Sequence, residues 1–133
     1  MSDRPLPRVD EESRGYWEAA RRHEFLLQRC RACSAYRYHP RAVCPDCLSS
    51  EVDWVVSAGR GEIYTFTVTY QNQSAGFAGR VPYVLAYVLL EEGIQVLTNI
   101  VDVDPDRVRI GQLVEVCFED LSDEISIPVF RPR

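Results

Sequence analysis

The sequence contains no lysine, and all 15 of its basic residues are arginines. It has only two histidines, which leaves little material for general-base catalysis, and no pair of carboxylates stands out as an acid–base pair. We therefore expect no catalytic activity from this chain alone.

Long apolar runs are missing as well. The longest, Val84–Leu90, is too short to cross a membrane and is typical of a buried strand. Residues 1–10 are polar and contain proline, without the apolar segment of a signal peptide. We therefore expect a cytoplasmic protein without a membrane span, in which disulfides are disfavoured.

The charge is unevenly distributed around a formal net charge of -5. Residues 1–47 hold nine arginines and seven acids, whereas residues 48–133 hold six arginines and thirteen acids. Proteins that bind single-stranded nucleic acids need a positive groove for the phosphates. The acidic second part therefore argues against a single-stranded nucleic-acid-binding module, which we keep as the alternative function.

Four cysteines carry the clearest chemical signal: Cys30, Cys33, Cys44 and Cys47 form two C-x-x-C pairs. Two intervening residues let both sulfurs of a pair turn toward one point, so the pairs together supply the tetrahedral shell that zinc prefers. The same shell suits iron, which stays open as an alternative. Because four thiolates leave no position for water or substrate, we predict a structural site.

Two other residues are weaker ligand candidates. His39 lies between the cysteine pairs, but four cysteines already complete the shell, so we expect it on the surface. Cys117 lies between Val116 and Phe118 in a strand pattern and is expected to be a buried structural thiol.

The order of elements predicts a mainly β protein. A tail and helix occupy residues 1–24, a zinc ribbon with two strands at 24–29 and 36–40 occupies 25–54, and residues 49–54 lead out of it. Residues 55–133 carry five expected strands and are predicted to form an OB-fold barrel, which leaves few exposed edges. The expected strands span residues 61–70, 82–90, 94–101, 113–118 and 125–130.

The first barrel strand alternates in character. Tyr64, Phe66, Val68 and Tyr70 are expected on one face, and an aromatic stripe of this kind is typical of a core. The alternation therefore predicts a half-buried strand over residues 61–70, although such aromatics could also stack bases.

Four residues are candidates for contact with a partner or with CoA. Tyr16 and Trp17 lie on or beside a helical stripe that extends to His23, and this stripe either packs on the protein's own core or docks on a partner. Phe77 and Arg80 lie in a polar, glycine-containing loop, where they are either contacts or ordinary solvated side chains.

Several motifs follow one another along nearly the whole chain: Tyr16-Trp17, Leu27-Gln28-Arg29-Cys30-x-x-Cys33, Pro40-Arg41-x-x-Cys44-Pro45-x-Cys47, Gly61-Glu-Ile-Tyr-Thr-Phe-Thr, Pro82-Tyr-Val-Leu-Ala, Leu97-Thr-Asn-Ile, Gly111-x-x-Val-Glu-Val and Pro128-Val-Phe. This order resembles the acyl-CoA-associated OB-fold family with a rubredoxin-like zinc ribbon, formerly a domain of unknown function.

The resemblance implies a non-catalytic accessory subunit with a structural zinc. Members of that family assist thiolase-like enzymes, including thiolases and retro-aldolases of steroid side-chain degradation, or MaoC-like hydratases. The partner carries the catalytic residues, while the small subunit stabilises it and helps to form the CoA or acyl channel. A hetero-oligomer that acts on acyl-CoA thioesters is therefore the expected setting of this chain.

Overall fold

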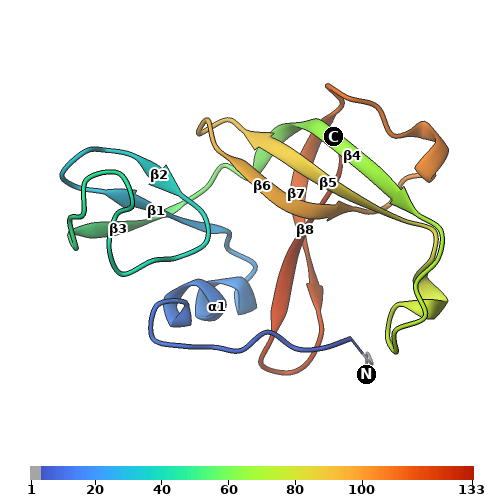
Figure 1. Cartoon of the computed structure of the whole chain (residues 1–133), viewed down its shortest axis with the longest axis horizontal. Helices are drawn as coiled ribbons and strands as arrows, with labels where there is room; N and C mark the ends of the chain where they lie inside the picture. The colour runs from blue at the N-terminus through green and yellow to red at the C-terminus, as the bar shows by residue number, and fades with distance from the viewer. Residues whose placement is uncertain (1–3) are drawn as a thin grey trace.

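Three strands form a small antiparallel sheet beside the barrel (Figure 1). Cys30 ends the first of these strands, and the other three ligand candidates lie between the strands. The computed structural model describes residues 4–133, and its first three strands are β1 (Leu26–Cys30), β2 (Tyr36–Arg37) and β3 (Val52–Val56), in the order β2-β1-β3. The two predicted ribbon strands are present. The expectation that residues 49–54 only lead out of the ribbon is wrong, because β3 turns back and pairs with β1 along its whole length.

Five further strands close into a barrel in the order β4-β5-β6-β8-β7. The parallel contact between β6 and β8 joins Ile100 to Phe130, and all other neighbours are antiparallel. This is the predicted five-stranded barrel. Its strands are β4 (Arg60–Thr69), β5 (Tyr83–Leu90), β6 (Gln95–Ile100), β7 (Leu113–Asp120) and β8 (Ser126–Pro132), with short 3-10 helices η1 (Ala78–Arg80) and η2 (Pro105–Arg107).

A bulge in β4 changes which of its side chains point inward. The register with β5 shifts between Ile63 and Thr65, so Tyr64 becomes the extra residue and is 54% exposed. Beyond the bulge, Phe66 packs against the core. The predicted aromatic stripe is therefore wrong for Tyr64, and also for Tyr70, which lies past the end of the strand and is exposed.

One apolar core runs through both sheets. Phe25, next to β1, meets Phe130 of β8 edge-on, with ring centroids 6.0 Å apart. Helix α1 (Arg14–Arg21) adds Tyr16, which is 3% exposed and whose ring centroid lies 6.5 Å from that of Phe25. The helical stripe thus packs on the protein's own core, and Tyr16 is part of it.

The helix ends earlier than its stripe predicted. His23 lies two residues beyond Arg21, with a φ of 60°, and stacks on Phe118 of β7 at 5.0 Å. Its Nε2 atom lies 2.9 Å from an Asp120 carboxylate oxygen. His23 therefore joins the end of the helix to the barrel. No helix within residues 4–133 has the length and apolar character needed to cross a membrane.

The joint between the two sheets is a short segment before β4. The Glu92 carboxylate, in the β5–β6 turn, accepts hydrogen bonds from the Ser57 hydroxyl at 3.0 Å and the Ala58 backbone N–H at 2.9 Å. Gly59 has a φ of +69°, and a Cβ there would lie 2.4 Å from a Val116 methyl carbon. Only glycine fits this close, left-handed turn.

Candidate metal centre

The four cysteines predicted as ligands converge on one point. Their sulfurs all lie within 4.8 Å of one another, with Cys30–Cys47 at 3.5 Å and Cys33–Cys44 at 3.7 Å. A tetrahedron with zinc–sulfur bonds of about 2.3 Å has edges of roughly 3.8 Å, whereas a disulfide is about 2.05 Å long. The donor set and its spacing therefore fit a four-thiolate metal ion, and all four cysteines are free of disulfides.

The two knuckles repeat one backbone geometry. The N–H of Ser34 donates to the Cys30 carbonyl at 2.9 Å, and the N–H of Leu48 donates to the Cys44 carbonyl at 2.8 Å. Ser34 and Leu48 have φ values of 66° and 65°, in the left-handed region that normally favours glycine. These two positions are not predictable from local pattern, because neither residue type is common in that conformation.

The two cysteine pairs also share one pattern of burial. The first cysteine of each pair, Cys30 or Cys44, is buried, and the second, Cys33 or Cys47, is exposed. The site thus lies at the surface of the ribbon, with one side closed by the protein. Such a closed four-thiolate shell holds two chain segments together and offers no open position for a substrate.

The surroundings of the thiols shift the pKa values of Cys30 and Cys47 in opposite directions. Hydrogen bonds from the backbone N–H groups of Cys33 and Ala32 lower the pKa of Cys30 to about 6. A backbone hydrogen bond from Ser49 acts to lower the pKa of Cys47, but the side-chain hydrogen bond with Cys30 and burial outweigh it and raise that pKa to about 12. Four thiolates this close repel one another, and a divalent cation at their centre would offset part of that repulsion.

A buried arginine supports the segment between the knuckles. Arg37 Nε donates to the Gln28 side-chain oxygen at 2.9 Å, and Arg37 Nη2 donates to the Arg41 carbonyl at 3.0 Å. The same Gln28 oxygen accepts the Arg41 N–H at 2.8 Å. Pattern reasoning missed Gln28, because a polar residue in a five-residue strand gives no sign that it points inward.

Three of the four candidate contact residues come together. Trp17 and Phe77 line one cavity of about 400 Å³, and Phe77 and Arg80 line an adjoining one of about 40 Å³. Arg80 Nη2 lies 3.6 Å from a Glu119 carboxylate oxygen. Tyr16 is separate, since its hydroxyl lies 3.1 Å from that of Tyr38 inside the core and burial raises its pKa. Contact of Trp17, Phe77 and Arg80 with a partner stays a prediction.

The outward side chains of β4, β5 and β6 form a nearly uncharged face, the outer barrel face. Cross-strand pairing aligns Thr65 with Tyr87 and Tyr87 with Leu97, and it aligns Thr67 with Leu85 one row further along. The tyrosine and both leucines are exposed. An exposed apolar patch on a soluble domain is typical of an interaction surface.

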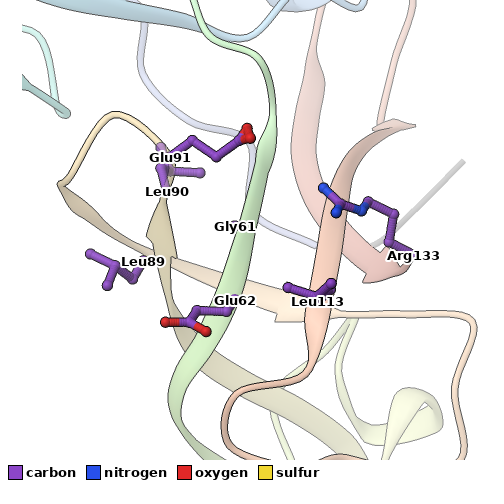
Figure 2. A pocket seen from close by; sticks show the side chains of 7 residues that line it. All are labelled: Gly61, Glu62, Leu89, Leu90, Glu91, Leu113 and Arg133. Atoms are coloured by element: carbon purple, nitrogen blue, oxygen red, sulfur yellow. The ribbon is translucent and has the colours of Figure 1, made fainter.

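A hollow of about 230 Å³ continues this face toward β7 (Figure 2). In Figure 2 the Arg133 side chain points toward β4, while Glu62 and Leu89 lie on the other side of that strand. Glu62 pairs in register with Leu89 on β5 and with Leu113 on β7, so apolar side chains flank it on both sides. The hollow therefore extends the outer barrel face by one row.

Comparison with known proteins adds a family to this geometry. The ChsH2 rubredoxin-like zinc ribbon domain matches residues 17–53, and the ChsH2 C-terminal OB-fold domain matches residues 54–119. A DUF35 domain-containing scaffold protein of Methanothermobacter thermautotrophicus is 31% identical over 117 residues, which cover 87% of both proteins. The chain belongs to the DUF35 family. The family resemblance seen in the sequence is thereby confirmed, together with the ribbon and barrel that it implied.

Two further relatives bear on function. The solved structure of the Ltp2-ChsH2(DUF35) aldolase contains a chain that is 36% identical to this DUF35 protein, with a TM-score of 0.85 over 95% of this chain and 98% of that one. The probable enoyl-CoA hydratase alpha subunit of Thermomonospora curvata is 36% identical over 129 residues. That match covers 97% of this chain but 40% of the hydratase subunit, so the chain spans less than half the length of that relative.

Proposed function

We propose that this chain is a non-catalytic accessory subunit that binds and stabilises a separate enzyme acting on acyl-CoA thioesters. The observation that carries the proposal is its end-to-end likeness to a chain of the Ltp2-ChsH2(DUF35) aldolase, at 36% identity. The outer barrel face supports it, because an exposed, nearly uncharged face is suited to a protein partner. The acidic barrel segment disfavours nucleic acid.

Within this class we propose a thiolase-like partner, either a thiolase or a retro-aldolase, in the cytoplasm. The aldolase relative is matched over 98% of its chain, whereas the hydratase relative is more than twice as long as the matched segment. The likeness to a chain of the aldolase structure, at 36% identity and a TM-score of 0.85, supports a partner of this kind. Steroid side-chain degradation is the process that the family resemblance suggests.

We assign a structural zinc to Cys30, Cys33, Cys44 and Cys47. When bound, the ion would join the two knuckles and neutralise part of the thiolate charge. Sulfur spacing near the edge of a zinc tetrahedron supports this choice. Metal analysis of the purified chain separates zinc from iron.

The cavity beside Trp17 and Phe77 is proposed as the chain's contribution to the acyl channel. Leu121 and Ile127 make its wall apolar, and Arg80 at the adjoining hollow offers a guanidinium group to an anionic group of CoA. The chain would thus line the channel while the partner performs the reaction.

The test is purification of the tagged chain from its native host, with mass spectrometry of co-purifying proteins and metal analysis of the same sample. We expect a thiolase-like protein in stoichiometric amount and about one zinc per chain. The double variant Phe77→Ala/Arg80→Ala should recover less of that partner. Tyr70→Ala, which removes an exposed aromatic near the same loop but outside both cavities, is the matched control.

A zinc-loaded chain that recovers no acyl-CoA enzyme would contradict the proposal. Salt-sensitive binding of that chain to single-stranded DNA would then support the nucleic-acid alternative.

A further inference from the structure

The ribbon sheet has two edges that differ in their protection. The β2 edge is two residues long and is followed closely by Pro40, which has no backbone N–H to offer. The β3 edge is five residues long, contains no proline and no lysine, and has no bulge against β1. Natural sheets usually protect a free edge with such features or with charged side chains, and the one charged residue of β3, Asp53, lies 3.3 Å from Arg31 in an ion pair.

The hydrogen bonds of the ribbon fix which groups of β3 point outward. Ser57 N–H donates to the Phe25 carbonyl, and Arg31 N–H donates to the Glu51 carbonyl, so the odd-numbered residues of this segment face β1. Backbone groups alternate in direction along a strand. The N–H and C=O groups of the even-numbered residues therefore face away from the sheet; these residues are Val52, Trp54 and Val56.

These outward N–H and C=O groups have no hydrogen-bond partner within residues 4–133. The side chains beside them are apolar and accessible, with Trp54 39% exposed and Val56 57% exposed. An edge with three free donors, three free acceptors and exposed apolar side chains matches one kind of occupant, namely another extended strand.

We propose that β3 is a strand-addition site, at which an extended segment of the partner enzyme pairs with Val52, Trp54 and Val56. The partner strand would carry apolar residues at the alternate positions that meet Trp54 and Val56. Glu51, exposed and without an ion pair among the described residues, favours a basic residue at the matching end. This inference rests on the proposed accessory function, because it needs a partner, but it specifies how the partner binds.

Amide hydrogen exchange measures directly whether the outward N–H groups of β3 are hydrogen-bonded. In the isolated chain the amides of Val52, Trp54 and Val56 should exchange fast, whereas those of Asp53 and Val55, which face β1, should exchange slowly. In the complex purified from the native host, the three fast amides should slow at least tenfold. Mass spectrometry with residue-level fragmentation resolves this alternation.

A proline substitution tests the same edge in the full chain. Val56→Pro removes one outward N–H and leaves the bonds to β1 intact, a placement that edge strands tolerate. Val56→Thr keeps the N–H and the branched side chain and is the matched control. We expect Val56→Pro to reduce the recovered partner at least tenfold and Val56→Thr to change it less than twofold, with zinc content unchanged in both.

The outcomes separate the two proposals. Recovery of no acyl-CoA enzyme by the unmodified chain would overturn the accessory function and the strand partner with it. Recovery of the enzyme with unprotected edge amides, or undiminished by Val56→Pro, would overturn the strand-addition site alone. Protection of the same amides in the isolated chain together with a doubled mass would show that a second copy pairs there, and would also overturn a partner strand.

Discussion

The barrel and the zinc ribbon are ordered in different ways. The barrel closes five strands on one another and fills its interior with apolar side chains, so each strand has a neighbour on both sides. The ribbon has three short strands, an open edge at β3 and four converging sulfurs. A segment of about 30 residues is too small for a sufficient core of its own, so a metal ion is the natural substitute.

The two regions also share part of their core. Phe25 reaches from the ribbon to Phe130 in the barrel, and Tyr16 of α1 packs behind it. Because the barrel is held by its own strand pairing, removing the metal should expose this aromatic contact without opening the barrel. The comparison thus predicts that the two regions respond differently to the same perturbation.

The largest expected effect comes from Cys44→Ser, which removes a buried ligand. Structural zinc in small domains is worth on the order of 10 kcal/mol, so we expect zinc content to fall well below one per chain and the amides of β1, β2 and β3 to lose protection. The amides of β5 should stay protected. Metal analysis and hydrogen exchange on the same sample measure both effects.

Cys117→Ser is the control, because Cys117 lies in β7 outside the cluster. It should keep its zinc and its ribbon protection. Loss of barrel protection in Cys44→Ser, to the same extent as ribbon protection, would contradict the separation of the two regions.

The second prediction concerns the joint between them. Gly59→Ala places a methyl group against Val116 at a left-handed φ, and we expect it to lower the free energy of unfolding by about 2–4 kcal/mol. Gly93→Ala is matched in conformation, with a φ of +90°, but its Cβ meets open space, so about 1 kcal/mol is expected. Urea unfolding with zinc in excess compares them, and equal losses would refute the steric explanation.

Much of this architecture was accessible from the sequence, because its signals are local. The cysteine spacing predicted the four sulfurs that converge in the structure, and alternation with intervening turns predicted the five barrel strands. The family resemblance supplied the topology, which alternation alone does not determine. The outward position of Tyr64 was not accessible, because it depends on the register between β4 and a strand about twenty residues later.

Two other features that local pattern did not settle have the same origin. Residues 52–56 form a strand only because β1, more than twenty residues earlier, offers its free edge. Tyr16 lies on a helical stripe that suits either a partner or the chain's own core, and only the position of Phe25 and Tyr38 decides between them. Long-range pairing and packing therefore set the limit of what local pattern can predict.

A smaller, pH-dependent effect is expected where α1 meets the barrel. Hydrogen bonds from the Ser126 hydroxyl and then the His23 ring lower the pKa of Asp120 below its ordinary value of 3.8. The ionised carboxylate is favoured in the folded state, so its contribution is present above that value and is lost as the pH falls through the lower folded pKa. Asp120→Asn should lower the melting temperature at pH 7 by roughly 2 °C, with the gap closing as the pH falls through the lowered pKa of Asp120.

Asp123→Asn, in the β7–β8 turn, is the control for this prediction and should follow the unmodified chain across the whole pH range. A gap for Asp120→Asn that stays constant down to pH 2 would show that the carboxylate's charge is not what stabilises the contact.

The smallest expected effect concerns positions with a left-handed backbone conformation, where the two regions use different residue types. In the barrel most of these positions are glycines, whereas the knuckles place Ser34 and Leu48 there. An L-residue in this conformation costs about 1–2 kcal/mol, and glycine loses about 0.5–1 kcal/mol more entropy on folding, so Leu48→Gly should stabilise the zinc-loaded chain by about 0.5 kcal/mol. Because Leu48 is 77% exposed, little packing is lost. The control is Val43→Gly, at an exposed position outside that conformation, which should destabilise the zinc-loaded chain in the same urea titration. If Leu48→Gly also lost stability, the metal-bound knuckle would impose no strain at this position.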